Sequence, residues 1–198
     1  MTTPTRAERD KGQARRQQIL EAAEECFRRR GFQGASVAEI CKGAGVSAGH
    51  LYHFYDSKEA IIAAIVQRDL EEKLDMLEQL SQRADITAAM LDEVDDGVND
   101  QLDNGGSALM LEVIAEAARN PKVADMVHRS DAIARAKLAE TIAKAKDCDP
   151  ASPELKAEVE VLIAMFEGLS TRAICNPDLD REAVVKVMRR MIRHILET

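Results

Sequence analysis

The chain has 198 residues, enough for one large domain or for a small domain followed by an ordinary one. Apolar residues make up 45% of the chain and aromatic residues only 3%, and the scarcity of alternating β-branched runs excludes an all-β or doubly wound fold. The net charge of −8 is unevenly distributed: residues 1–58 hold ten Lys and Arg against seven Asp and Glu, while the rest holds 17 against 28. A basic N-terminal part on an acidic body is typical of a protein that binds a polyanion.

No apolar run approaches the length of a membrane span, and the first residues are polar and lack a signal-peptide core. We therefore expect a cytoplasmic protein. Its four cysteines, Cys26, Cys41, Cys148 and Cys175, are widely spaced and form no CxxC motif. This spacing favours free thiols in a reducing compartment.

Residues 1–11 are polar and are expected to form a flexible arm. Residues 12–30 then repeat with a helical period, with Ile19, Ala23 and Phe27 on one face, and Gly31 can end this helix in a left-handed conformation. Helical patterns continue to the end of the chain over residues 57–80, 86–102, 107–119, 122–146, 153–175 and 180–196. Together with two short helices between 36 and 55, the sequence predicts an all-α fold of about nine helices.

The segment from 36 to 55 contains two short helices joined by a glycine turn. Ser36 and Glu39 form a capping box for the first helix, and Ser47 caps the second, which runs to about Phe54. Gly45 lies in the turn, where the backbone needs a positive φ. This spacing fits a helix-turn-helix, whose second helix presents its outer face to the major groove of DNA.

The outer face of that second helix carries the candidate DNA contacts. Small residues at its start let the helix end approach the duplex, and Tyr, His and Ser side chains donate hydrogen bonds to phosphates or base edges. Lysines on either side are expected to add phosphate contacts. The full candidate set is Lys42, Ser47, Ala48, Gly49, His50, Tyr52, His53 and Lys58.

At these residues the chain resembles the tetracycline-repressor (TetR) family of bacterial transcriptional regulators. The resemblance is carried by residues 18–23, Phe27, residues 31–32, 37–40, 44–47, 51–52 and 57–60, about the first third of the chain, and by a softer match at residues 166–169 and 172–173. Two positions depart from the family pattern. The family often has Lys or Arg where this chain has Ala48, and it usually has Tyr or His followed by Phe where this chain has Phe54 and Tyr55.

The resemblance implies a homodimer in which two helix-turn-helix heads, residues 12–56, bind double-stranded DNA at a palindromic operator. It also implies that residues 57–198 form a ligand-binding and dimerisation domain with a pocket for an unknown small-molecule inducer. We therefore expect a repressor that the inducer releases from DNA. The helix beginning at Ser57 would tilt when ligand binds and change the separation of the two heads.

Methionines on the apolar stripes of the body favour an adaptable pocket, because thioethers conform to irregular ligands. The candidate pocket residues are Met90, Met110, Ile114, Met126, His128, Met165, Phe166 and Arg172. The last two helices carry apolar groups on more than one side, and Ala164 and Gly168 would let a partner helix come close. The candidate dimer interface is Leu162, Ala164, Gly168, Leu169, Val184, Met188, Met191 and Ile195.

The sequence shows no nucleophile–base set and no paired carboxylates at catalytic spacing, so we do not expect an enzyme. It also predicts no cofactor and no metal site: His50 and His53 lack a third ligand nearby, and Val94 occupies a required ligand position in the acidic stretch from 92 to 103. Two alternatives remain open. One is a DNA-binding protein without a small-molecule ligand, and the other is a regulator that senses redox state through its cysteines.

Overall fold

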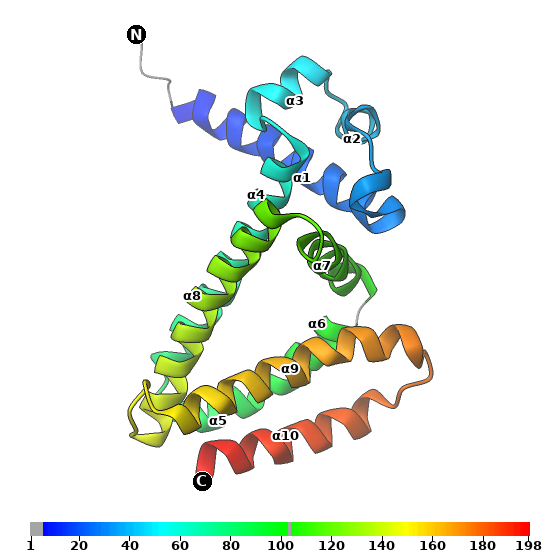
Figure 1. The fold of residues 1–198 in the computed structure, drawn as a ribbon. Helices are drawn as coiled ribbons and strands as arrows, with labels where there is room; N and C mark the ends of the chain where they lie inside the picture. Colours follow the sequence, from blue (N-terminus) through cyan, green and yellow to red (C-terminus); the bar gives the residue numbers. More distant parts are fainter. Residues whose placement is uncertain (1–5, 103) are drawn as a thin grey trace. The chain divides into compact units, whose positions relative to one another are not determined.

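A computed structural model describes residues 6–102 and 104–198 of the chain. Within these residues it has ten α-helices and no strand (Figure 1). Their bounds are α1 Arg6–Gly34, α2 Val37–Ala44, α3 Ala48–Phe54, α4 Lys58–Ser81, α5 Ile86–Asp92, α6 Val94–Leu102, α7 Asn104–Ala117, α8 Pro121–Lys146, α9 Pro153–Cys175 and α10 Arg181–Glu197. The all-α prediction is confirmed, and the extra helix arises because residues 86–102 form α5 and α6 rather than one helix.

The break between α5 and α6 lies at Glu93. Its φ of −73° and ψ of −8° close the last turn of α5, and its N–H donates to the carbonyl of Ala89. The Glu93 carbonyl in turn accepts the N–H of Gly97 in α6. The hydrogen bonds thus continue through the break, and a helical period in the sequence does not reveal it.

Helix α1 begins at Arg6, so the expectation of a flexible arm is wrong for residues 6–11, and its remaining part, residues 1–5, lies outside the described residues. Near the other end of α1, Gly31 has φ 69° and ψ 166°. The positive φ was expected, but ψ is extended rather than left-handed helical. The chain is therefore kinked at Gly31 and adds another turn up to Gly34.

The chain divides into two compact units. Unit 1 runs up to Arg68 and includes Glu112–Val127, and unit 2 consists of Asp69–Leu111 and His128–Thr198. Three helices, α4, α7 and α8, contribute residues to both units. The units therefore differ from a simple division at residues 56 and 57, because a segment from the middle of the chain belongs with the N-terminal helices.

The core of unit 1 is formed by α1, α2, α3 and the beginning of α4. Ile19, Ile40, Leu51 and Ile61 are fully buried in it, and Phe27 packs against Phe32 with ring centroids 5.4 Å apart. The helical period of residues 12–30 predicted this buried face of α1. Burial of each large apolar side chain stabilises the unit by about 1.5–3 kcal/mol relative to exposure.

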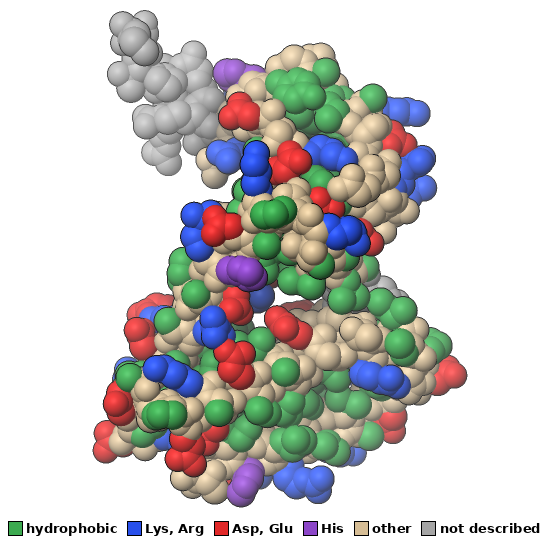
Figure 2. Space-filling model, in the orientation of Figure 1, with side chains coloured by type: hydrophobic (Ala, Val, Ile, Leu, Met, Phe, Trp, Pro, Cys, Tyr) green, Lys and Arg blue, Asp and Glu red, His purple; other side chains and the backbone are tan. Residues whose placement is uncertain are grey.

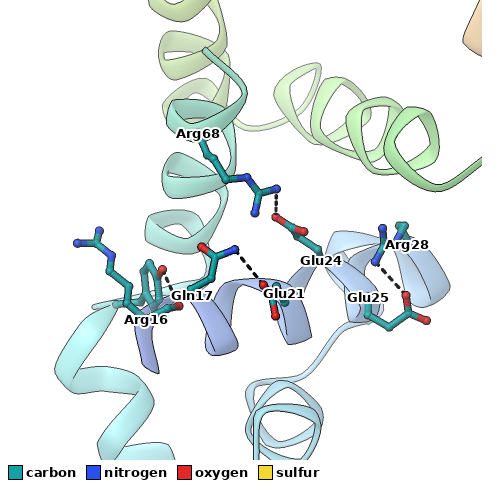
Figure 3. A network of polar contacts seen from close by, with 8 residues as sticks. Arg16, Gln17, Glu21, Glu24, Glu25, Arg28 and Arg68 are labelled. Atoms are coloured by element: carbon teal, nitrogen blue, oxygen red, sulfur yellow. Dashed lines mark hydrogen bonds and ion pairs between the residues drawn. The ribbon is translucent and has the colours of Figure 1, made fainter. Parts of the chain in front are cut away.

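A polar network joins α1 to α4 inside unit 1. Arg68 of α4 reaches the carboxylate of Glu24 in α1, 2.5 Å away (Figure 3). Glu24 is only 7% exposed, and its burial raises its pKa although the charge of Arg68 acts in the opposite direction. The ion pair therefore compensates a buried carboxylate that would otherwise lack a partner.

The segment Glu112–Val127 is tied to the end of α1 by two carboxylates. The backbone N–H of Phe32 donates to Glu112 Oε2 at 3.4 Å, and the side chain of Gln33 donates to Glu116 Oε2 at 2.9 Å. Glu116 is 2% exposed and also accepts a hydrogen bond from the side chain of Asn120. These bonds explain why α7 and α8 supply part of unit 1.

Unit 2 has its own core, in which α6 packs against α9 and α10, and α5 packs against α10. Its buried residues include Val98, Ile142, Leu155, Val159 and Ile192. Figure 1 shows α9 and α10 running in opposite directions. Helices α6 and α9 approach closely at Gly97 and Phe166. A Cβ added at Gly97 would lie only 2.9 Å from the ring of Phe166, so a larger residue does not fit there without a shift.

A partly buried ion pair fastens three helices of unit 2 together. The ammonium of Lys146, at the end of α8, donates to both carboxylate oxygens of Glu158 in α9 at 2.8 Å. It also donates to the carbonyl of Ile195 in α10 at 2.8 Å.

Among the described helices, none is both long enough and apolar enough to cross a membrane.

Candidate nucleic-acid interface

The two short helices of unit 1 have the caps that the sequence predicts. The Ser36 side chain accepts from the N–H of Glu39, and Glu39 accepts from the backbone N–H and hydroxyl of Ser36. These bonds hold the pKa of Glu39 below its usual range. Gly45 ends α2 in the left-handed region, with φ 60° and ψ 36°. The capping-box and positive-φ predictions are thus confirmed.

One side of helix α3 is buried in unit 1, and the other side is exposed. Leu51 is its one buried side chain, at 0% exposure, while Ser47, Ala48, Gly49, His50, Tyr52 and His53 are all exposed. The large side chain of Tyr52 is 49% exposed. The polar face of α3 is therefore available to a partner, and Lys42 at the end of α2 is exposed as well.

The aromatic side chains at the end of α3 fix its position on α1. The Tyr55 hydroxyl donates to the backbone carbonyl of Arg16 at 3.3 Å, and the guanidinium of Arg16 lies 5.2 Å from the centre of the Tyr55 ring. Tyr55 is 2% exposed, so the buried hydroxyl has the partner that it needs. This contact fixes the position of α3, and it lies away from the exposed face of the helix.

Lys58 has a different surrounding from the one the sequence suggested. Its ammonium donates to the carbonyls of Phe32 at 2.7 Å and Ala35 at 2.9 Å, and it lies 4.4 Å from the centre of the Phe32 ring. The side chain therefore satisfies the carbonyls at the end of α1. Because its charge is already engaged inside unit 1, we remove Lys58 from the set of expected phosphate contacts.

The eight candidate pocket residues fall in both units. Ile114 and Met126 belong to unit 1, and the other six belong to unit 2. Met90, Met165 and Phe166 are partly buried against the core of unit 2, whereas His128 and Arg172 are exposed. Met110 and Met126 are half-buried, and Ile114 is 47% exposed.

Two recesses in unit 2 are lined by other residues. One, of about 340 Å³, has a mostly charged and polar lining: Glu72, Asp75, Met76, Gln79, Leu80, Arg83 and Glu93. The other, of about 660 Å³, lies between α8 and α9 and is rich in alanine: Ala132, Arg135, Ala136, Ala139, Glu140, Pro150, Ala151, Lys156, Ala157, Val159 and Glu160. Neither contains a residue of the predicted pocket.

The candidate dimer residues separate into two groups. Leu162, Leu169 and Met188 are less than 9% exposed in the single chain and belong to the core of unit 2, so their assignment to an interface is corrected. Met191 is 45% exposed, Ala164 and Gly168 are exposed, and Val184 and Ile195 are half-buried. This second group lies on the surface, as an interface requires.

Two further apolar residues belong on this surface and were missed from the sequence. Val161 of α9 is 50% exposed, and Val187 of α10 is 44% exposed. Val161 is three residues before Ala164 and seven before Gly168, so helical spacing alone indicates that it shares their face. Hydrophobic side chains gather over α9 and α10 in the space-filling view (Figure 2). We call Val161, Ala164, Gly168, Val187 and Met191 the α9–α10 face.

The cysteines are all free thiols. Cys41 is buried, Cys26 is half-buried, and Cys148 and Cys175 are exposed. Burial raises the pKa of the Cys26 thiol, which disfavours the reactive thiolate. Within the described part of the chain, no three His, Cys, Asp or Glu side chains gather closely enough to hold a metal ion.

Comparison with known proteins identifies the class. Residues 19–65 match the family described as "Bacterial regulatory proteins, tetR family", and residues 84–197 match "BetI-type transcriptional repressor, C-terminal". The HTH-type transcriptional regulator UidR of Escherichia coli K12 is 32% identical over 187 residues, which cover 93% of this chain and 94% of UidR. The HTH-type transcriptional repressor AcnR of Corynebacterium diphtheriae is 38% identical over 55 residues, 28% of this chain and 29% of AcnR.

Solved structures agree with this assignment. Salmonella enterica GusR superposes with a TM-score of 0.76 at 29% identity, covering 93% of this chain and 96% of GusR. A transcriptional regulator of Pseudomonas aeruginosa PAO1 has the same fold, with a TM-score of 0.78 at 21% identity over 94% of this chain and 92% of its own. The protein is therefore a DNA-binding transcriptional regulator of the helix-turn-helix class. The chain belongs to the TetR family, as its N-terminal motifs indicated.

Proposed function

We propose that this regulator is a homodimeric repressor that binds a palindromic operator through α3 and is released by a small molecule. The observation that carries the proposal is the open polar face of α3, which is held in place by Leu51 and by the Tyr55 hydroxyl bond. A rigid helix with one exposed face suits insertion into a major groove. In this proposal the protein acts in the cytoplasm, where the DNA is.

The proposed DNA contacts are the exposed residues Lys42, Ser47, Ala48, Gly49, His50, Tyr52 and His53. Ser47 Oγ already accepts from the N–H of His50 at 3.2 Å, and its hydroxyl proton is left to donate to a phosphate. Tyr52 has a free phenol for the same purpose. Gly49 leaves room, since nothing lies within 4 Å of a Cβ added there.

Dimerisation is proposed to occur through the α9–α10 face. Exposed Val161, Val187 and Met191 would lose contact with water when a second copy covers them. Ala164 and Gly168 supply a flat strip on which a partner helix can lie, and nothing lies within 4 Å of a Cβ added at Gly168. Two copies related by a two-fold axis present two α3 helices to successive major grooves, about 34–36 Å apart.

Release is proposed to follow binding of a small molecule by the body, at Met90, Met110, Ile114, Met126, His128, Met165, Phe166 and Arg172. Helices α4, α7 and α8 each contribute residues to both units. We propose that a ligand-induced shift is transmitted along all three helices rather than along α4 alone. Ligand and operator would then be coupled through one equilibrium, typically by 1–3 kcal/mol.

Selection of bound duplexes from random DNA tests the proposal directly. We expect a palindromic sequence with half-sites one helical turn apart. Against that duplex, Tyr52→Ala should lower the affinity by about tenfold or more, because it removes a hydrogen-bonding contact. Ile133→Ala in α8 is a matched control, since Ile133 and Tyr52 have the same 49% exposure. Equal affinity of the two variants would reject the placement of α3.

A further inference from the structure

The exposed face of α3 carries no permanent positive charge. Residues 43–57 contain neither Lys nor Arg, and the flanking lysines are Lys42 and Lys58. The ammonium of Lys58 is engaged with two carbonyls of unit 1. The side chains of this stretch that can become cations are therefore His50 and His53, and both are exposed.

The ring of Phe54 organises these two histidines. His50 stacks on it, with ring centroids 5.5 Å apart and an interplanar angle of 14°, and His53 meets it edge-on at 5.1 Å and 77°. Both imidazoles are thus oriented at the surface, three residues apart on one helix. Within the described residues, neither imidazole makes a hydrogen bond or an ion pair, so their ring nitrogens remain available.

The charged groups around the two histidines come from α1, from α2 and from the residue that follows α3. In α2, which packs against α3, the titratable residues are Glu39, Cys41 and Lys42. Glu39 is bound by Ser36 and by Arg30, whose guanidinium lies 2.9 Å from its carboxylate. Cys41 is buried, and Lys42 is exposed.

Two more charges lie near the end of α3. The guanidinium of Arg16 in α1 lies over the Tyr55 ring, and Asp56 follows α3 and is exposed. Neither Asp56 nor Glu39 makes an ion pair with His50 or His53 in the part of the chain that the structure describes. Among the described residues, both imidazoles therefore lack a carboxylate partner.

We propose that His50 and His53 take up protons when unit 1 binds DNA, so that operator affinity is linked to pH. The proposal rests on the proposed function, because it requires α3 to face the duplex. A free imidazole is charged below about pH 6.5 and neutral above it, within the range that cells use. Phosphates next to the rings favour the imidazolium form, since an opposite charge stabilises the protonated state.

The coupling between proton uptake and DNA binding determines how the affinity depends on pH, in sign and in size. Because the complex binds more protons than the free protein and DNA, affinity falls as pH rises, by up to about tenfold per pH unit for each proton taken up. Two histidines in each of two subunits give up to four such protons. The charged rings also neutralise phosphates, so the salt dependence should be steeper at low pH, by about 0.9 log unit per additional phosphate.

The experiment measures affinity for the selected duplex at pH 6, 7 and 8 with the full-length protein. We expect the wild type to bind at least about tenfold more tightly at pH 6 than at pH 8. His50→Gln combined with His53→Gln should flatten the profile at low affinity. His50→Lys combined with His53→Lys should flatten it while keeping tight binding at pH 8. His194→Gln in α10, which changes an exposed histidine outside the proposed DNA contacts and the proposed pocket, should keep the wild-type profile.

Three results would overturn the proposal alone: wild-type affinity that does not change between pH 6 and 8, a pH profile that survives in the His50 and His53 glutamine variant, or a profile that disappears in the His194→Gln control. Absence of sequence-specific binding at every pH would overturn the proposed function as well, and the two failures are thereby distinguished. Circular dichroism at each pH confirms that the helices are intact in every variant.

Discussion

Lys42 and Lys58 flank helix α3, yet their ammonium groups meet different surroundings. Lys42 is exposed, whereas the Lys58 ammonium donates to the carbonyls of Phe32 and Ala35. Sequence spacing places both lysines near α3 but does not say which way a flexible side chain turns. The chain is kinked at Gly31, just before the Phe32 and Ala35 carbonyls that Lys58 reaches, and helical spacing does not predict this local backbone path.

Replacing these lysines separates a structural role from a DNA contact. Lys58→Met should lower the free energy of unfolding by about 1–3 kcal/mol, because two carbonyls lose a charged donor. Lys42→Met, the control, should change it by less than about 0.5 kcal/mol. Urea unfolding followed by circular dichroism measures both. If Lys58→Met instead leaves stability intact and reduces the salt dependence of operator binding, Lys58 belongs with the phosphate contacts after all.

At the scale of helices, local signals predict the start and end of α2 and α3 well. Ser36, Gly45 and Ser47 each act through backbone groups within a few residues, so short-range chemistry is sufficient to place them. The break at Glu93 and the early start of α1 at Arg6 lack such signals. The apolar period continues through Glu93, so hydrophobic spacing alone does not reveal the break between α5 and α6.

Two glycines near the turn should respond to alanine in opposite ways. Gly45→Ala should destabilise the protein by about 1–2 kcal/mol, because φ 60° forces the new Cβ against the backbone. Gly49→Ala lies in α3 with open space around it and should stabilise the free protein by up to about 1 kcal/mol. Thermal unfolding measures the two changes.

The same Gly49→Ala variant should bind the operator less tightly, because its methyl group occupies space between α3 and the duplex. In this one variant, the free energy of unfolding should rise while the affinity for the operator falls. Unchanged affinity in this variant would show that the start of α3 does not approach DNA closely.

At the scale of the whole chain, the family assignment and the all-α class follow from motifs in the first third, while the body is less predictable. Leu162, Leu169 and Met188 share helices with the exposed apolar residues, and only the packing of α6 against α9 and α10 shows which face is core. A helix with apolar residues on two sides predicts two contacts but does not tell which one is made within the protomer.

The α9–α10 face should determine the oligomeric state. Val161→Glu combined with Met191→Glu places unpaired charges on the proposed interface, so we expect a monomer at micromolar concentration with an intact helical spectrum. Ile133→Glu, which charges an equally exposed apolar site on α8, should stay dimeric. Analytical ultracentrifugation distinguishes the two. A charged variant that remains dimeric would move the interface elsewhere.

The bonds from Glu112 and Glu116 to the end of α1 have a consequence for protein engineering. A chimaera made by grafting only the first 56 residues onto a related regulator would leave behind the carboxylates that receive the Phe32 amide and the Gln33 side chain. The grafted segment would then face the residues that the related regulator has at the positions of Glu112 and Glu116. To exchange DNA specificity between such regulators, two separate segments should therefore be transferred. Residues 112–127 should be moved together with the N-terminal part of unit 1.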